Sequence, residues 1–150
     1  MNLSELMVDT KSAWVEYPGY TGFEVEVVNL SRPELTALRK RCLITKYDKA
    51  TRKPVEELNE EKFISEFTKA TIKNWKGFKF KYLEDFVLVN LSSVDPEKEM
   101  PYTDENARLL VTNSSEFDTW VNDTVFDLEN FRSKSKGTDV ATPGAVAQKS

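Results

Sequence analysis

The alternation of hydrophobic and polar residues predicts β structure near the start of the chain. Residues 14–17, which include Trp14, Val15 and Tyr17, lead into a turn-forming segment at 18–22, which holds one proline and two glycines. In the next segment Phe23, Val25 and Val27 alternate with two glutamates, so the three apolar side chains share one face. We therefore expect a two-stranded hairpin with its other face in water.

A helix is predicted directly after this hairpin. The run Ser31–Glu34 matches a capping box, in which a serine hydroxyl and a glutamate carboxylate satisfy free N–H groups of the first turn. Leu35, Leu38 and Cys42 then fall on one helical face. This placement predicts that the single cysteine is a buried, unreactive thiol.

A second helix is predicted after a polar connection. Residues 43–58 contain turn formers and charges but little core, which favours a mobile hairpin or excursion. Asn59 is a good N-cap, and Gly77 is a natural residue to end a helix that runs to Trp75. Its apolar residues cover about half of the helical circumference. We expect this wide helix to be central or partly covered by another element.

The remaining segments also favour helices. Residues 78–91 mix strand-like alternation with helical spacing, and a helix from Lys81 is the preferred interpretation. N-cap residues at Thr103 and at Ser114 or Ser115 predict two final helices. The last helix keeps its apolar side chains within about 140° of arc as far as Phe131. Phe126 points to the opposite, acidic face, where it is either a simple exposed residue or a partner-contact anchor.

These elements together predict an α+β fold that is mainly α. We expect a small N-terminal β-hairpin followed by a bundle of four or five helices, in one globular domain spanning residues 1–132. Residues 133–150 contain no aromatic residue and no stable hydrophobic period. Such a segment buries too little apolar surface to offset its ordering entropy, which predicts a disordered, flexible C-terminal tail.

Composition disfavours catalysis. The 150 residues include no histidine and one cysteine, which removes the commonest general base and the usual zinc ligands. Neither nucleotide-binding glycine motif is present. We therefore predict a non-enzyme with no catalytic, cofactor-binding or metal-binding residues. The chain shows no signal peptide or membrane-length apolar run, and with one cysteine it suits a reducing cytoplasm.

The net charge of −4 conceals two segments of opposite charge. Residues 37–81 carry thirteen basic and six acidic residues, whereas residues 95–131 carry ten acidic and two basic residues. The two segments could pack together or share a solvated surface. Alternatively, they could dock on each other between copies, or on a partner. The overall acidity disfavours nucleic-acid binding, despite the basic cluster at 39–41.

Several short motifs, in a particular order, resemble one family. The order begins with Trp75–Gly77, continues with Pro101–Ala107 and Trp120-Val121, and ends with Asn130-Phe131. This order is similar to that of the lambda-type tail assembly chaperones of long-tailed, siphovirus-type bacteriophages. The resemblance extends to the turn and helix start at 17–35 and covers about residues 10–132.

The resemblance implies a chaperone that binds the tape-measure protein and keeps it soluble while tail-tube subunits polymerise. Such a protein acts in the host cell cytoplasm and is absent from the mature virion. A longer form made by translational frameshifting would recruit the tail-tube protein, and self-association is possible. No nucleic acid or membrane partner is implied. The partner-binding candidates are Ile72 and Trp75 on the excess apolar arc, Phe78, and Phe126.

Two alternatives stand beside this function. A structural or minor tail component, such as a tube or terminator subunit, would need long strands, which the pattern does not predict. An acidic phage-encoded inhibitor or adaptor that imitates DNA would need carboxylates spread over an extended surface. The basic segment at 37–81 argues against that second alternative.

Overall fold

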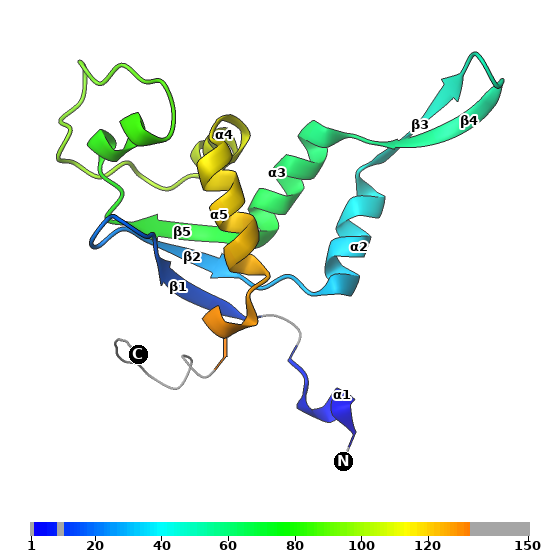
Figure 1. The fold of residues 1–150 in the computed structure, drawn as a ribbon, viewed down its shortest axis with the longest axis horizontal. Coiled ribbons are helices and arrows are strands. Elements are labelled where there is room, and N and C mark those ends of the chain that lie inside the picture. The colour runs from blue at the N-terminus through cyan, green and yellow to red at the C-terminus, as the bar shows by residue number, and fades with distance from the viewer. Residues whose placement is uncertain (1, 9–10, 133–150) are drawn as a thin grey trace.

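A computed structural model of the chain describes residues 2–8 and 11–132. In this part of the chain a three-stranded sheet supports a layer of helices, and a separate two-stranded hairpin projects from the body (Figure 1). The tail predicted at 133–150 lies outside the described residues.

The N-terminal hairpin is confirmed. Strands β1 (Ser12–Glu16) and β2 (Glu24–Val28) pair antiparallel, and β5 (Ile72–Lys76) pairs with the other edge of β2. Phe23, Val25 and Val27 are completely buried, as their alternation predicts. The opposite face of the sheet is open to solvent, where the Lys76 ammonium lies 4.5 Å from the centre of the Trp14 ring.

The predicted helix starts are also confirmed. The capping residues are Ser31 for α2 (Arg32–Arg41), Asn59 for α3 (Glu60–Thr71), Thr103 for α4 (Asp104–Asn113) and Ser114 for α5 (Ser115–Val125). Each cap accepts a hydrogen bond from a backbone N–H of the first turn, because its side-chain oxygen replaces the missing helical carbonyl. The short exposed helix α1 (Leu3–Leu6) precedes the sheet, and the 3-10 helix η2 (Leu128–Asn130) follows α5.

The predicted fold class, mainly α with a bundle of four or five helices, is wrong. The described chain is α+β, but its strands form two sheets, β1-β2-β5 and β3-β4, and the helices do not form a bundle of their own. Helices α3, α4 and α5 instead lie beside the three-stranded sheet (Figure 1). The sequence-based interpretation missed the third strand of the first sheet and gave the second sheet only as the hairpin alternative at 43–58.

The third strand lies where the sequence predicts the end of a helix. Helix α3 ends at Thr71, and the chain continues directly into β5. The pairing of β2 with β5 contains a register shift between Glu26 and Val27, so both Ile72 and Trp75 face the core. Two inward residues three positions apart imitate the spacing of a helix, which explains the wrong prediction.

Two further boundaries differ from the prediction. The helix expected from Lys81 is a short 3-10 helix, η1 (Phe80–Asp85). The last helix ends at Val125 rather than near Phe131. Two amides satisfy carbonyls at this end: Asn29 donates to the Val125 carbonyl at 2.9 Å, and Asn130 donates to that of Thr124 at 3.0 Å.

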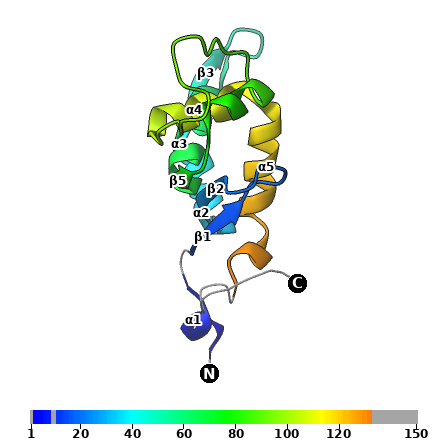
Figure 2. The same ribbon diagram turned by 90° about the vertical axis from the view of Figure 1, so that its left-hand side faces the viewer.

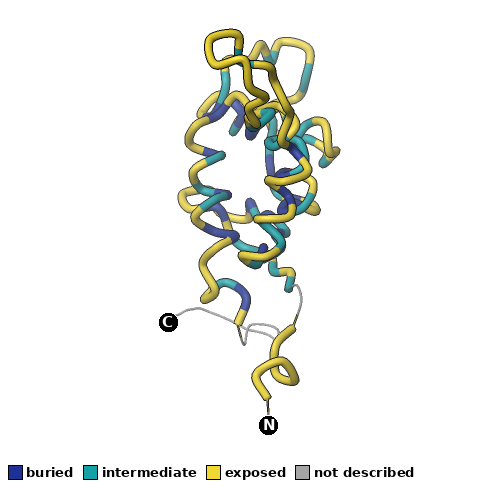
Figure 3. Tube along the Cα trace, turned by 90° about the vertical axis from the view of Figure 1, so that its right-hand side faces the viewer, coloured by how far each residue is buried: buried dark blue, intermediate teal, exposed yellow. Residues whose placement is uncertain are grey.

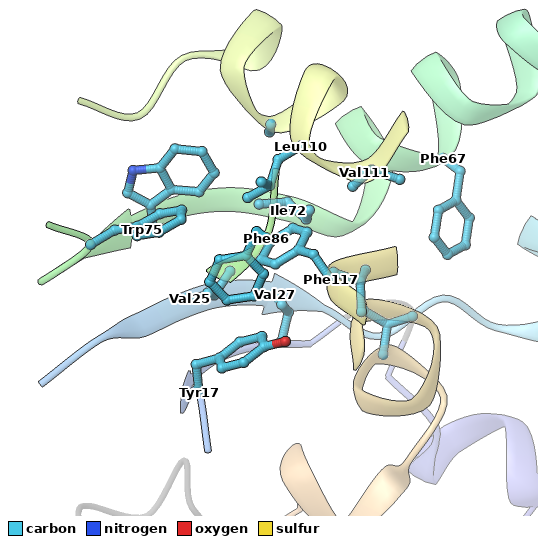
Figure 4. Close-up of a cluster of buried hydrophobic side chains, with 14 of the residues drawn as sticks. Tyr17, Val25, Val27, Phe67, Ile72, Trp75, Phe86, Leu110, Val111 and Phe117 are labelled. Carbon is cyan, nitrogen blue, oxygen red and sulfur yellow. The ribbon is translucent and has the colours of Figure 1, made fainter. Parts of the chain in front are cut away.

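The core is aromatic and lies between the sheet and the helices. Figure 4 shows Tyr17, Phe86 and Phe117 gathered beside β2 with side chains from β5 and α4. The rings of Phe23 and Phe78 stack with their centres 4.2 Å apart. Along the tube of Figure 3, buried residues concentrate in the middle of the molecule, and the loops at its upper end are mostly exposed. Cys42 is a free thiol and is buried, as predicted.

The connection at 43–58 is a β-hairpin of its own. Strands β3 (Leu43–Asp48) and β4 (Lys53–Leu58) pair antiparallel in full register, which confirms the hairpin alternative. The hairpin extends beyond α2 and α3, away from the three-stranded sheet (Figure 1). Its base is closed by the Asn59 N–H, which donates to the Cys42 carbonyl at 2.8 Å.

Candidate partner-binding site

An open apolar groove lies between α4 and the segment that follows η1. Figure 2 shows this segment running past α4 at one end of the molecule. The groove has a volume of about 570 Å³, in the range of sites that hold a bound ligand or side chains of a partner. Its lining residues are Leu83, Val87, Leu88, Val89, Met100, Asn106, Leu109, Leu110 and Asn113, which we call the apolar groove.

One wall of the apolar groove is a single face of α4. Asn106, Leu109, Leu110 and Asn113 are spaced three, four and seven positions apart, which places them on the same side of a helix. Leu110 is buried and belongs to the core, whereas Leu109 is exposed. The two amides hydrogen-bond within the chain, to the carbonyls of Pro101 and Leu109. The wall is therefore apolar at its centre and polar at both ends.

The other wall is the chain from Leu83 to Val89. Leu83 and Phe86 are buried and anchor this segment, with the Phe86 ring edge-on to Tyr17 at 5.3 Å. Leu88 is fully exposed, and Val89 is also exposed. A fully exposed leucine beside an apolar depression is an unfavourable arrangement in water, because its hydration is not relieved by any contact. The wall is thus suited to burial against a partner.

Backbone and ionic contacts tie residues 79–81, which directly precede this wall, to residues 96–98 of the loop that follows it. The Phe80 N–H donates to the Lys98 carbonyl at 2.8 Å, and the Lys81 N–H donates to that of Pro96 at 3.0 Å. The ammonium groups of Lys81 and Lys79 both contact the Glu97 carboxylate and lower its pKa. These pairs are exposed, so salt weakens them. The groove wall is therefore fixed mainly by its backbone contacts and its buried anchors.

The structure places the predicted partner-binding residues in two different environments. Ile72, Trp75 and Phe78 are buried. The Trp75 indole donates to the Met100 carbonyl at 2.9 Å and so holds the end of the long loop against β5. These three side chains present almost no free surface in this fold, because the strand geometry of β5 turns Ile72 and Trp75 into the core, and Phe78, after the strand, stacks on Phe23.

Phe126 is exposed, as its position opposite the apolar stripe indicates. It is the C-cap residue of α5, and 41% of its surface is accessible. Its ring lies against Phe67 of α3, with ring centres 6.2 Å apart. The structure does not bring Phe126 together with the other three predicted residues or with the apolar groove.

The sequence-based interpretation missed the groove residues Leu88 and Leu109. A signal for Leu88 was present, because it lies off the helical face formed by Leu83, Phe86 and Val87 in the ambiguous segment. An apolar residue that lies off the apolar face of its segment is a candidate for an exposed contact. Leu109 gives no such signal, since it directly precedes the core residue Leu110.

The buried Tyr17 and the half-buried Tyr20 act as structural hydrogen-bond donors. Tyr20 donates to Asp85 at 2.7 Å, and Tyr17 donates to Glu116 at 3.3 Å. Burial, with the hydrogen bond to Asp85, raises the pKa of Tyr20 to about 12. Burial and the negative charge of Glu116 raise the pKa of Tyr17 still further. Both hydroxyls are therefore protonated at neutral pH.

The described residues provide neither a cluster of metal ligands nor a membrane-spanning helix. Within residues 2–8 and 11–132, no group of three or more histidine, cysteine or acidic side chains is placed to hold a metal ion. No helix in the same part of the chain has the length and hydrophobicity needed to cross a membrane.

Comparison with known proteins identifies a family. The family model described as "YdaY prophage protein" matches residues 33–141, which are 109 of the 150 residues. The match begins within α2, so the β1–β2 hairpin precedes it, and it includes the whole apolar groove. It indicates that the chain derives from a phage. No curated protein and no solved structure matched.

Proposed function

We propose that this chain, which belongs to the YdaY prophage protein family, is a phage tail assembly chaperone. It binds the tape-measure protein, keeps that protein soluble in the host cytoplasm while tail-tube subunits polymerise, and leaves before the virion is complete. The phage origin and the ordered motifs at 75–131 support this proposal. The single observation that carries it is the apolar groove beside α4.

The apolar groove suits one face of a partner helix. Recognition of a helix needs a hydrophobic trough that takes side chains at positions three and four apart. The exposed side chains of Leu88, Val89 and Leu109 line the trough on both sides. Burying one such side chain contributes about 1.5–3 kcal/mol. Asn106 and Asn113 at the two ends limit the length of helix that fits without polar partners.

The size of the groove also fits a transient role. A few apolar side chains give modest affinity after association has cost translational and rotational freedom. A long helical protein can then be covered by many copies that bind weakly and are displaced by the growing tube. A tightly closed pocket would favour permanent binding instead.

Co-expression with the tape-measure protein of the same phage tests this function. We expect wild-type chaperone to co-purify with that protein and to increase its soluble fraction. Leu88→Asp and Leu109→Asp place a carboxylate in the groove and should abolish both effects. Leu6→Asp is a matched control, because Leu6 is an exposed leucine of α1 outside the groove.

Thermal unfolding of each variant shows whether the fold is intact, since all three substitutions are at exposed positions. Full co-purification of both groove variants would overturn the assignment of the groove. A Phe126→Asp variant tests the second predicted surface, at Phe126, separately from the groove. Loss of binding in that variant alone would move the site to the end of α5. Failure of the wild-type chain to bind would overturn the function itself.

A further inference from the structure

The β3–β4 hairpin exposes apolar side chains on both of its faces. Directly opposed residues of an antiparallel pair share a face, so Leu43 and Tyr47 lie on one side and Ile44 and Val55 on the other. All four are exposed, and Tyr47 is 65% accessible. A two-stranded hairpin without a covering layer is only marginally stable in water. We call residues 43–58 the arm.

The tip of the arm is basic and ordered. Residues 46–53 contain one acidic residue, Asp48, and four basic residues, Lys46, Lys49, Arg52 and Lys53. Asp48 organises the turn, since its carboxylate accepts from the Ala50 N–H at 2.9 Å and its carbonyl from the Arg52 N–H at 2.7 Å. The turn therefore presents the cations on a defined loop.

Arg52 occupies a conformation that glycine adopts more readily. Its φ is 60°, and it is the one non-glycine residue with positive φ in the described ranges. A residue with a Cβ pays a conformational cost there. The tip thus combines a glycine-like backbone with an exposed positive charge, which suits electrostatic contact better than it suits the stability of the turn.

A cleft of opposite character lies on α5. It has a volume of about 500 Å³ and is lined by Tyr17, Pro18, Ser115, Glu116, Thr119, Trp120 and Asp123, which we call the acidic cleft. Its two charged lining residues, Glu116 and Asp123, are both acidic and exposed. The half-buried Trp120 packs against Tyr17, with ring centres 4.6 Å apart, and gives the cleft an aromatic wall.

We propose that the arm of one copy of this chain docks in the acidic cleft of another copy. The basic tip would pair with Glu116 and Asp123, and Tyr47 would pack against the aromatic wall at Trp120. Complementary charge would steer the two copies together and set the register of docking. Arginine and lysine can also lie over a tryptophan face, which adds a cation–π contact.

The arm and the acidic cleft lie at different ends of one molecule. In Figure 1 the arm extends from the side opposite the β1–β2 turn, which carries Pro18 of the cleft. The two surfaces are different, so their contact is heterologous and joins copies head to tail. Such a contact repeats from copy to copy and leaves the apolar groove of each copy free, because the two sites share no residue.

Sedimentation of the full chain over a range of concentrations at low and high salt tests the proposal. We expect association that strengthens with concentration and weakens by about tenfold or more between low and high salt, because charge contacts at the rim are screened. The double variant Lys49→Glu/Arg52→Glu should weaken association by about tenfold or more, and Asp123→Lys should do the same.

Combining the three charge reversals provides the decisive result, because the carboxylates introduced at 49 and 52 then meet the ammonium introduced at 123, and Glu116 is the one acidic lining residue of the cleft left to oppose them. We expect the triple variant to recover part of the association that each set of reversals loses. Lys69→Glu is a matched control at an exposed position of α3, outside both surfaces, and should associate normally. Circular dichroism confirms that each variant is folded.

Three results would overturn the proposal: a monomer at every concentration, association insensitive to the reversals, or no recovery in the triple variant. Association that survives the reversals would point to edge-to-edge strand pairing by the arm. The experiment uses no tape-measure protein, so its failure leaves the proposed chaperone function untouched.

Discussion

Replacement of Gly77 by alanine tests how closely β5 approaches the β1–β2 turn. Gly77 follows β5 and has a φ of +72°, a conformation that costs alanine about 1–2 kcal/mol. An added Cβ would also clash with the carbonyl oxygen of Gly22 and lie 2.7 Å from its carbonyl carbon. Both atoms are backbone, so relief requires the turn to move. Overpacking of this kind costs about 1–3 kcal/mol more.

We therefore expect Gly77→Ala to lower the free energy of unfolding by about 2–5 kcal/mol. Gly19→Ala is the matched control. Gly19 has a φ of +92°, and a Cβ there meets no atom within 4 Å, so only the conformational cost applies. That variant should lose about 1–2 kcal/mol.

Urea unfolding monitored by tryptophan fluorescence measures the free energy of unfolding of both variants. The buried Trp75, two residues from Gly77, reports the unfolding because it becomes exposed to water. Equal losses of stability in the two variants would refute the close approach of Gly77 to Gly22. Gly77 would then have only the role that the sequence alone suggests, which is to end a helix.

Three other predictions follow from buried or capping groups. Ile72→Asp should prevent folding, seen by circular dichroism, because the carboxylate would be buried without a partner; a folded variant would contradict the β5 strand. Ser31→Ala should cost about 0.5–2 kcal/mol in urea unfolding, because the Glu34 N–H loses its cap; no change would argue against the capping box. Burial raises the pKa of Tyr102 to about 12, so the folded state resists ionisation and loses stability as the pH rises from 10 towards 12. Tyr102→Phe should therefore lose less stability than wild type between pH 9 and pH 11, and an equal loss would contradict this.

The two proposed surfaces are formed by different elements of the chain. The apolar groove uses α4 and the segment after η1, whereas head-to-tail docking uses the arm and α5. The segregated charges at 37–81 and 95–131 correspond in part to the arm and the cleft. The structure keeps these parts of the two segments on separate surfaces, which leaves them available for contact between copies.

The sequence by itself determined the features that depend on neighbouring residues. The caps at Ser31, Asn59, Thr103 and Ser114, and the buried face of β2, were all predicted correctly. A cap is a hydrogen bond across three positions, and an alternating strand needs only one buried face. Both can therefore be recognised within a short window. The exposure of Phe126 was predictable for the same reason.

Only the tertiary structure decided the third strand, the end of α5 and the candidate site. Residues 72–76 form a strand because the edge of β2 is available to pair with them, and a bulge in that pairing gives Ile72 and Trp75 the spacing of a helix. Asn29 ends α5 from a position 96 residues away. The apolar groove likewise needs Leu88 and Leu109 on two separate elements. Contacts between distant segments set all three features, and a short window of sequence does not contain those contacts.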